Sequence, residues 1–75
     1  MKRTYRDPLR DILAKNLRRL RAAHGFSQEA LVHESGINRT YLSAVERAER
    51  NISIDNIAGI AKGLRVRPWT LLRDK

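Results

Sequence analysis

The chain has no cysteine and few prolines, glycines and aromatic residues: two, four and four of its 75 residues. Without cysteine it has neither a disulfide framework nor a cysteine-ligated metal site, which fits a reducing compartment such as the cytoplasm. No apolar run approaches the ~20 residues that span a bilayer, and no apolar signal-peptide stretch follows the basic N-terminus. We therefore expect a soluble, cytoplasmic protein without a membrane partner.

Acidic residues are also scarce relative to basic ones. Sixteen Lys and Arg against eight Asp and Glu give a formal net charge of +8 and an isoelectric point near 11.1. This charge suits a polyanion, and nucleic acid is a better candidate than an anionic membrane surface. The few aromatic residues provide no stacking platform for single strands.

Chemistry at a metal or a nucleophile is not indicated. His24 and His33 lack a partner at metal-ligand spacing, and no activated nucleophile accompanies them. We therefore predict no metal, no cofactor, no small-molecule ligand and no enzyme activity.

The length of the chain limits its core. A domain of 75 residues buries only about 60% of the surface that its unfolded chain exposes, so every apolar face is needed. Residues 1–6 carry three positive charges and no apolar periodicity, which predicts a basic flexible arm. Residues 7–75 are predicted to form one domain.

Apolar residues recur at helical spacing in four segments, each of which opens with a helix-start signal. The start signals are, in chain order, Asp7 with Pro8, Ser27, Asn38 and Ser53. The predicted core stripes are Leu9, Ile12, Leu13, Leu17 and Leu20; Ala30, Leu31 and Val32; Tyr41, Leu42 and Val45; Ile54, Ile57, Ile60, Ala61 and Leu64. A last short helix is predicted from Pro68 onward. No segment alternates over a strand's length, so the predicted fold is all-α, a compact domain of five helices.

The second and third predicted helices are short and are joined by a turn that contains Gly36. Two such helices form a helix-turn-helix, in which the second one enters the major groove of DNA. A tight turn leaving a helix commonly needs a positive φ, which costs a residue with a Cβ roughly 1 kcal/mol or more and costs glycine little. Gly36 therefore fits this turn.

The third predicted helix has two opposite faces. At about 100° per residue, its polar residues span about 0° to 100° of the helical wheel and its apolar residues about 200° to 300°. The polar residues are Arg39, Thr40, Ser43 and Arg47. Arginine can donate two hydrogen bonds to O6 and N7 of guanine. Threonine has a hydroxyl that can form hydrogen bonds and a methyl that can contact thymine. We therefore predict base contacts from this face, led by Arg39 and Thr40.

The start of the second predicted helix is a candidate phosphate site. Free backbone amides and the positive end of the helix dipole lie there beside Gln28. A phosphate held at this point would fix the register of the third helix on the duplex.

Residues 17–66 resemble the Cro/C1-type helix-turn-helix family of phage repressors and bacterial regulators. Their sequence is LRRLRAAHGFSQEALVHESGINRTYLSAVERAERNISIDNIAGIAKGLRV, about two-thirds of the chain. Within the family, the stretch NRTYLSAVERAERN is most similar to the controller proteins of restriction-modification systems, and many other regulators share it.

The resemblance implies a repressor-like domain that binds double-stranded DNA as a two-fold homodimer on paired half-sites. It implies base recognition by Arg39 and Thr40, with Ser43 and Arg47 along the groove. It also implies an internal ion pair between Arg21 and Glu46. The predicted phosphate contacts are Ser27, Gln28, Asn38, Arg50 and Asn51. For Gln28, the resemblance implies either a backbone phosphate or an adjacent base.

Three residues depart from the family pattern. Val32 stands where alanine is usual, which predicts a slightly wider packing of the second helix against the third. Ala48 stands where glycine usually ends the third helix, so the exit of that helix is an open question. Glu49 adds a negative charge to a loop that is expected to face phosphates.

Several side chains keep a second interpretation. Thr40 could serve only as a hydrogen-bonding residue at a helix start, and Gln28 only as a helix former. Tyr41 is expected to pack with its hydroxyl at the surface rather than to contact DNA. The arm either reaches a minor groove or makes no contact.

The basic face of the first helix is expected to be solvated: Arg10, Lys15, Arg18 and Arg19. The C-terminal apolar residues are expected to close the core, with a dimer contact as the second possibility: Trp69, Leu71 and Leu72.

The sequence thus predicts a sequence-specific transcriptional regulator that binds a palindromic operator as a dimer, with its third helix in the major groove. Two alternatives stay open. One is a protein-interaction module whose charge serves only solubility. The other is a nonspecific nucleic-acid binder that relies on charge alone.

Overall fold

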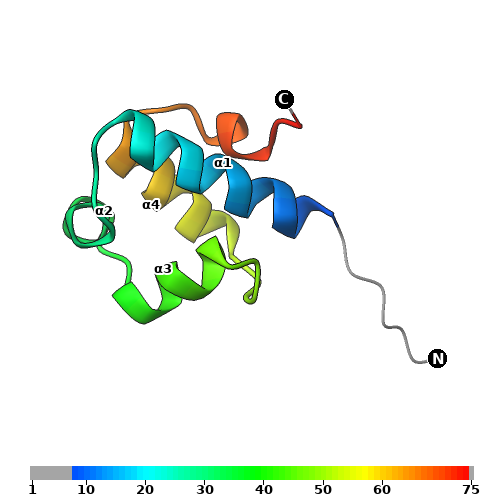
Figure 1. The fold of residues 1–75 in the computed structure, drawn as a ribbon, viewed down its shortest axis with the longest axis horizontal. Helices are drawn as coiled ribbons and strands as arrows, with labels where there is room; N and C mark the ends of the chain where they lie inside the picture. Colours follow the sequence, from blue (N-terminus) through cyan, green and yellow to red (C-terminus); the bar gives the residue numbers. More distant parts are fainter. Residues whose placement is uncertain (1–7, 75) are drawn as a thin grey trace.

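The computed structural model describes residues 8–74, which form four α-helices and a C-terminal 3-10 helix (Figure 1). The elements are α1 (Leu9–Ala23), α2 (Gln28–Ser35), α3 (Arg39–Glu46), α4 (Ile54–Leu64) and the 3-10 helix η1 (Pro68–Leu72). No strand occurs in this part of the chain, so the predicted all-α class is confirmed. The predicted arm and the predicted cap Asp7 lie outside the described residues.

The prediction of five α-helices is wrong for the last element. The segment that Pro68 opens is a 3-10 helix of five residues, in which the Thr70 amide donates to the Arg67 carbonyl, three residues back, at 2.9 Å. Such i to i+3 bonds suit short pieces of chain. A segment this short has little room for the longer bonds of an α-helix.

Three of the predicted caps are confirmed. The side-chain oxygens of Ser27, Asn38 and Ser53 each accept a hydrogen bond from the backbone N–H three residues on, at 3.0, 3.1 and 3.0 Å. Each bond satisfies a backbone donor that the first turn of a helix leaves open, and such a cap contributes about 1 kcal/mol. These bonds fix where α2, α3 and α4 begin.

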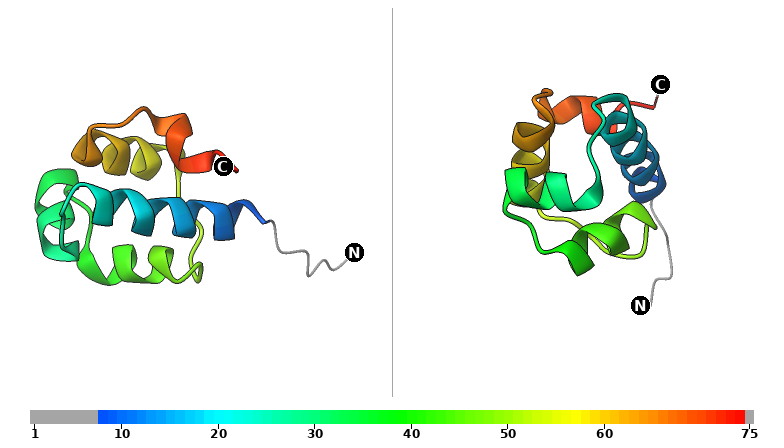
Figure 2. Two further views of the ribbon diagram at one scale, coloured as in Figure 1. Left: turned by 45° about the horizontal axis from the view of Figure 1, so that its top comes forward. Right: turned by 60° about the vertical axis from the view of Figure 1, so that its left-hand side comes forward.

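The helices pack around one core: α1 contacts α3 and η1, and α4 contacts α2 and η1 (Figures 1 and 2). The first residues of two predicted core stripes, those of α1 and α4, are not buried. Leu9 is 45% exposed and Ile54 is 82% exposed. Each is the first residue of its helix, where there is no preceding turn and less of the neighbouring helices to cover it. The buried core comprises Leu13, Leu17, Leu20, Leu31, Ile37, Leu42, Val45, Ile60, Ala61, Leu64 and Leu71.

The C-terminal segment is tied to α1 through a buried amide. Asn16 is buried, and its Nδ2 donates to the carbonyls of Leu71 and Arg73 at 2.9 and 2.7 Å. Leu71 is fully buried and closes the core, as expected, whereas Trp69 and Leu72 are exposed. The closing role therefore belongs to one of the three C-terminal apolar residues.

Ala48 forms the exit of α3 in a conformation that favours glycine. Its φ is +61°, and its N–H donates to the Val45 carbonyl at 3.0 Å. The side chain is buried. The chain thus makes the left-handed turn at this point with an alanine, at a backbone cost that glycine would not have.

Candidate nucleic-acid interface

The turn between α2 and α3 has the geometry that the sequence predicts. Gly36 has φ +74° and ψ +11°, and its N–H donates to the Val32 carbonyl at 2.8 Å. A Cβ added there would meet no atom within 4 Å. Glycine is therefore favoured by the backbone conformation and not by lack of space.

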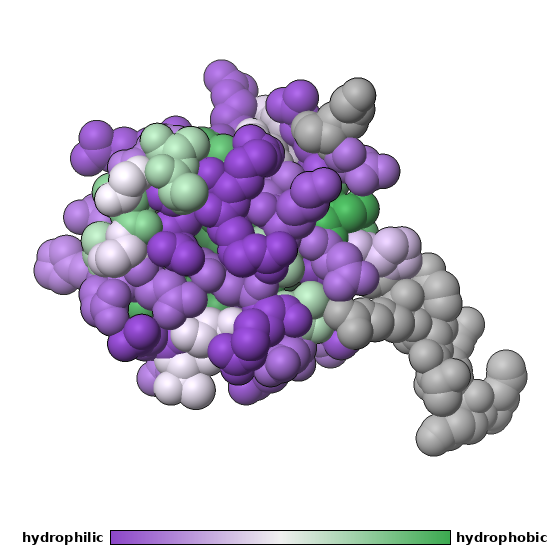
Figure 3. All heavy atoms as spheres, in the orientation of Figure 1, coloured by the Kyte–Doolittle hydropathy of each residue, from purple (hydrophilic) through white to green (hydrophobic). Residues whose placement is uncertain are grey.

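Helix α3 lies at the edge of the molecule in every view (Figures 1 and 2). Leu42 and Val45 on its inner side are buried, whereas Arg39 and Thr40 at its start are exposed. The visible surface over this helix is hydrophilic to neutral (Figure 3). The predicted division into an anchoring face and an outward polar face is confirmed for these four residues.

Arg39 is exposed but held in place by the start of α2. Its Nη1 lies 2.7 Å from Oε2 of Glu29, and its Nε donates to Oε1 of Gln28 at 3.4 Å. The arginine and glutamate side chains are 58% and 62% exposed. The guanidinium is therefore oriented by α2 while it stays accessible from outside.

Gln28 joins the polar face of α3 to a buried carboxylate. Its Oε1 accepts from the Ser43 hydroxyl at 2.9 Å as well as from Arg39, and its Nε2 donates to Oε1 of Glu46 at 2.9 Å. Sequence patterns do not indicate these contacts, because the partners lie 11 to 18 residues apart. Gln28 is thus a positioning residue for α3, whatever else it contacts.

Arg21 and Glu46 form an ion pair between α1 and α3. Nε and Nη2 of Arg21 donate to Oε2 and Oε1 of Glu46 at 2.7 and 3.0 Å, and Nη1 donates to the Phe26 carbonyl at 3.0 Å. The glutamate side chain is 5% exposed and the arginine side chain 22%. This arginine is engaged inside the fold and is not offered to a ligand.

The remaining residues predicted to contact bases differ in their exposure and in their internal hydrogen bonds. Thr40 is exposed and Ser43 is half-buried, and the Ser43 hydroxyl donates to Gln28. Arg47 directly follows the last residue of α3, and its Nε donates to Oε1 of Glu49 at 3.0 Å. The negative charge of Glu49 is therefore paired with a neighbouring arginine.

The loop after α3 carries Arg50 and Asn51, two predicted phosphate contacts. The guanidinium carbon of Arg50 lies 5.2 Å from the ring centroid of Tyr41, and the Tyr41 hydroxyl donates to the Asn51 carbonyl at 3.0 Å. The Asn51 side-chain oxygen accepts from Arg10 of α1. The loop is therefore fixed from both α3 and α1.

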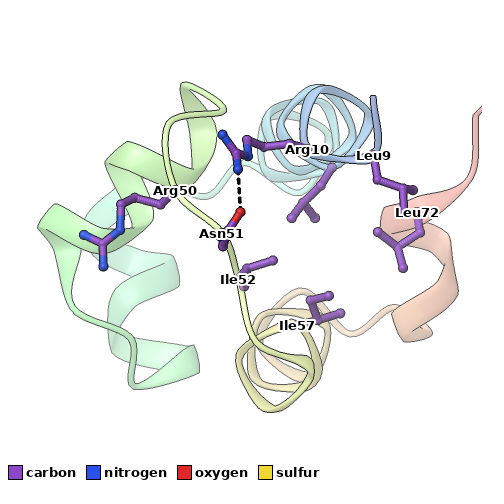
Figure 4. A pocket seen from close by; sticks show the side chains of 8 residues that line it. Leu9, Arg10, Arg50, Asn51, Ile52, Ile57 and Leu72 are labelled. Carbon is purple, nitrogen blue, oxygen red and sulfur yellow. Dashed lines mark hydrogen bonds between the residues drawn. The ribbon is translucent and has the colours of Figure 1, made fainter. Parts of the chain in front are cut away.

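This loop also borders a hollow of about 290 Å³, which it forms together with residues of α1, α4 and η1 (Figure 4). In the close-up, Asn51 faces Arg10 across the rim, while Arg50 points away from the hollow. The hollow is lined by Leu9, Arg10, Leu13, Arg50, Asn51, Ile52, Ile57 and Leu72. Arg50 is therefore accessible from the side of α3.

The basic face of α1 is less freely solvated than predicted. Arg10 donates to Asn51, Arg18 donates to the Glu46 carbonyl at the end of α3, and Arg19 donates to Asn16 at 3.2 Å. Lys15 is exposed. Arg10 and Arg18 thus help to hold the end of α3 and its loop against α1.

No helix within residues 8–74 is long and apolar enough to cross a membrane. The same residues contain no group of three or more His, Asp or Glu side chains close enough together to hold a metal ion.

The helix-turn-helix family model matches residues 17–68, a span that includes α2, the turn and α3. The chain belongs to the Cro/C1-type helix-turn-helix family. A hypothetical transcription factor of Neisseria meningitidis serogroup B is 47% identical over 64 residues, which are 85% of this chain and 60% of that protein. The chain thus spans less than two-thirds of that relative.

Solved structures of restriction-modification controller proteins have the same fold. C.AhdI from Aeromonas hydrophila is 42% identical, with a TM-score of 0.79 over 89% of this chain and 98% of that chain. C.Esp1396I, solved as a tetramer in complex with its natural 35-base-pair operator, is 32% identical. Its TM-score is 0.81, over 88% of this chain and 87% of that chain. The predicted resemblance to controller proteins is therefore confirmed.

Proposed function

We propose that this protein is a transcriptional regulator that binds an operator in double-stranded DNA as a two-fold dimer, with α3 in the major groove. The observation that carries the proposal is the exposure of Arg39 and Thr40 at the start of a helix whose opposite face is buried. Support comes from the operator complex of a relative with a TM-score of 0.81.

Base recognition is assigned to α3. Arg39 would bind guanine, and Thr40 would contact a neighbouring base through its hydroxyl or methyl group. Ser43 and Arg47 would extend this surface along the groove, with Arg47 exchanging Glu49 for a DNA acceptor.

Phosphate binding is assigned to groups that keep a donor after their internal bonds are made. Ser27 and Asn38 accept cap bonds through their oxygens, which leaves the Ser27 hydroxyl hydrogen and the Asn38 amide hydrogens for phosphate. Gln28 keeps one amide hydrogen after its bond to Glu46, Asn51 accepts from Arg10 through its oxygen and keeps its amide hydrogens, and Arg50 offers a guanidinium. These contacts would supply affinity and register but little sequence information.

A two-fold dimer would place its half-site centres about 34 to 36 Å apart, one turn of DNA. The exposed apolar residues Trp69 and Leu72 are candidates for the dimer contact. The proposed regulator needs no chemical step and no cofactor. It would act in the cytoplasm.

The experiment begins with selection of bound sequences from a random DNA pool, followed by titration of the selected duplex and a random duplex. Arg39→Ala should weaken binding to the selected duplex by about 1 to 3 kcal/mol and change binding to random DNA little. Arg50→Ala should weaken both similarly and lower the salt slope by about one. Equal losses on both duplexes for Arg39→Ala would reject base recognition. Failure to select any sequence would favour a protein-interaction module or a charge-driven binder.

A further inference from the structure

We propose that Glu29 is a specificity-determining residue, which positions Arg39 for guanine and disfavours DNA that offers Arg39 no base partner. This inference rests on the proposed function. Glu29 is the second residue of α2, and its carboxylate is the closest charged partner of the Arg39 guanidinium, at 2.7 Å.

The pairing leaves Arg39 able to bind a base. A guanidinium has five N–H donors, and the contacts with Glu29 and Gln28 use two of them. Three donors stay available, enough for two hydrogen bonds to the O6 and N7 atoms of guanine. Because an arginine side chain loses considerable rotamer freedom when it is fixed, a conformation set by α2 before binding lowers the entropic cost of that contact.

The same carboxylate opposes binding that depends on phosphates alone. Glu29 is exposed and neighbours Ser27 and Gln28, where phosphate contacts are assigned, so its charge repels the DNA backbone. Its pairing with Arg39 also cancels a positive charge at the start of α3. On a selected operator, the contact between Arg39 and guanine offsets this repulsion and the cancelled charge. A random duplex provides no such contact.

Two substitutions separate positioning from charge. Glu29→Asp keeps the charge but withdraws the carboxylate by one methylene, which breaks the 2.7 Å contact. It should weaken binding to the selected duplex by about two- to fivefold and leave random DNA unchanged. Glu29→Gln also removes the repulsion, so it should strengthen binding to random DNA by about two- to fivefold while binding to the selected duplex stays near that of the wild type. Both substitutions should lower the specificity ratio by about two- to fivefold.

The matched control is Glu34→Gln, which removes the same charge from an exposed position near the other end of α2. It should leave the specificity ratio unchanged. In an Arg39→Ala background, Glu29→Gln and Glu29→Asp should no longer alter the ratio, because the side chain that Glu29 positions is absent. An unchanged or increased ratio in the single variants, or a fall that persists without Arg39, would overturn the proposal. A wild-type protein without any sequence preference would instead overturn the proposed function.

Discussion

Glu46→Gln tests how much the fold depends on the buried ion pair between α1 and α3. The substitution keeps the size of the side chain but removes its charge. The carboxylate accepts two hydrogen bonds from Arg21 and one from Gln28. A neutral amide offers one oxygen in place of two and turns an NH2 group toward a donor.

The expected loss follows from the burial of the pair. Removing one partner of a buried ion pair costs about 3 to 5 kcal/mol, and a hydrogen bond to a charged group contributes about 1.5 to 3 kcal/mol. Arg21 remains 22% exposed and keeps its bond to the Phe26 carbonyl, so we expect the lower end, about 3 kcal/mol. Domains of this length have a free energy of unfolding of about 4 to 11 kcal/mol. The melting temperature should fall by about 12 to 24 °C.

The assay is urea and thermal unfolding followed by far-ultraviolet circular dichroism. Glu34→Gln, the same chemical change at an exposed position, should alter the free energy of unfolding by no more than about 0.5 kcal/mol. The double variant Arg21→Met with Glu46→Leu should recover much of the loss, because apolar residues of similar volume can replace a buried pair. A loss below about 1 kcal/mol for Glu46→Gln would refute the reasoning and place the pair among ordinary surface ion pairs.

Two further predictions concern the backbone and the C-terminus. Gly36→Ala should lower the free energy of unfolding by about 1 kcal/mol, whereas Ala48→Gly should raise it by up to about 1 kcal/mol, because relief of the left-handed backbone exceeds loss of a buried methyl. Urea unfolding of both variants would measure this, and equal signs would contradict it. Asn16→Ala leaves the Leu71 and Arg73 carbonyls without their donor and should cost about 2 kcal/mol. Hydrogen exchange should then accelerate more in residues 68–73 than in α2. An equal acceleration in both segments would contradict the assigned role of this amide.

The parts of the fold that the sequence predicts are those that depend on neighbouring residues. Ser27, Asn38 and Ser53 bond to amides three residues away, so their cap roles are visible in a short window of sequence. Gly36 takes the left-handed conformation that its turn needs. The anchoring role of Leu42 and Val45 follows from helical spacing alone.

Prediction fails where burial or pairing depends on distant parts of the chain. Ile54 continues the apolar stripe of α4, yet it is mostly exposed, because spacing does not reveal where the neighbouring helices end. The two backbone carbonyls that accept from the Asn16 amide lie more than 50 residues away. The pairing of Arg39 with Glu29 follows from the angle between α2 and α3. Helical periodicity within either helix does not contain that angle.

The core and the candidate interface are physically coupled through Gln28. One run of polar contacts leads from Arg21 through Glu46 and Gln28 to Ser43 and Arg39. The buried carboxylate fixes the Gln28 amide, and that amide in turn orients two side chains of α3. The Glu46 side chain that anchors this network is 5% exposed. It therefore restricts the conformations of the outward side chains before they bind, and less conformational entropy is lost on binding. The ion pair that stabilises the fold thereby also positions the proposed base-contacting residues.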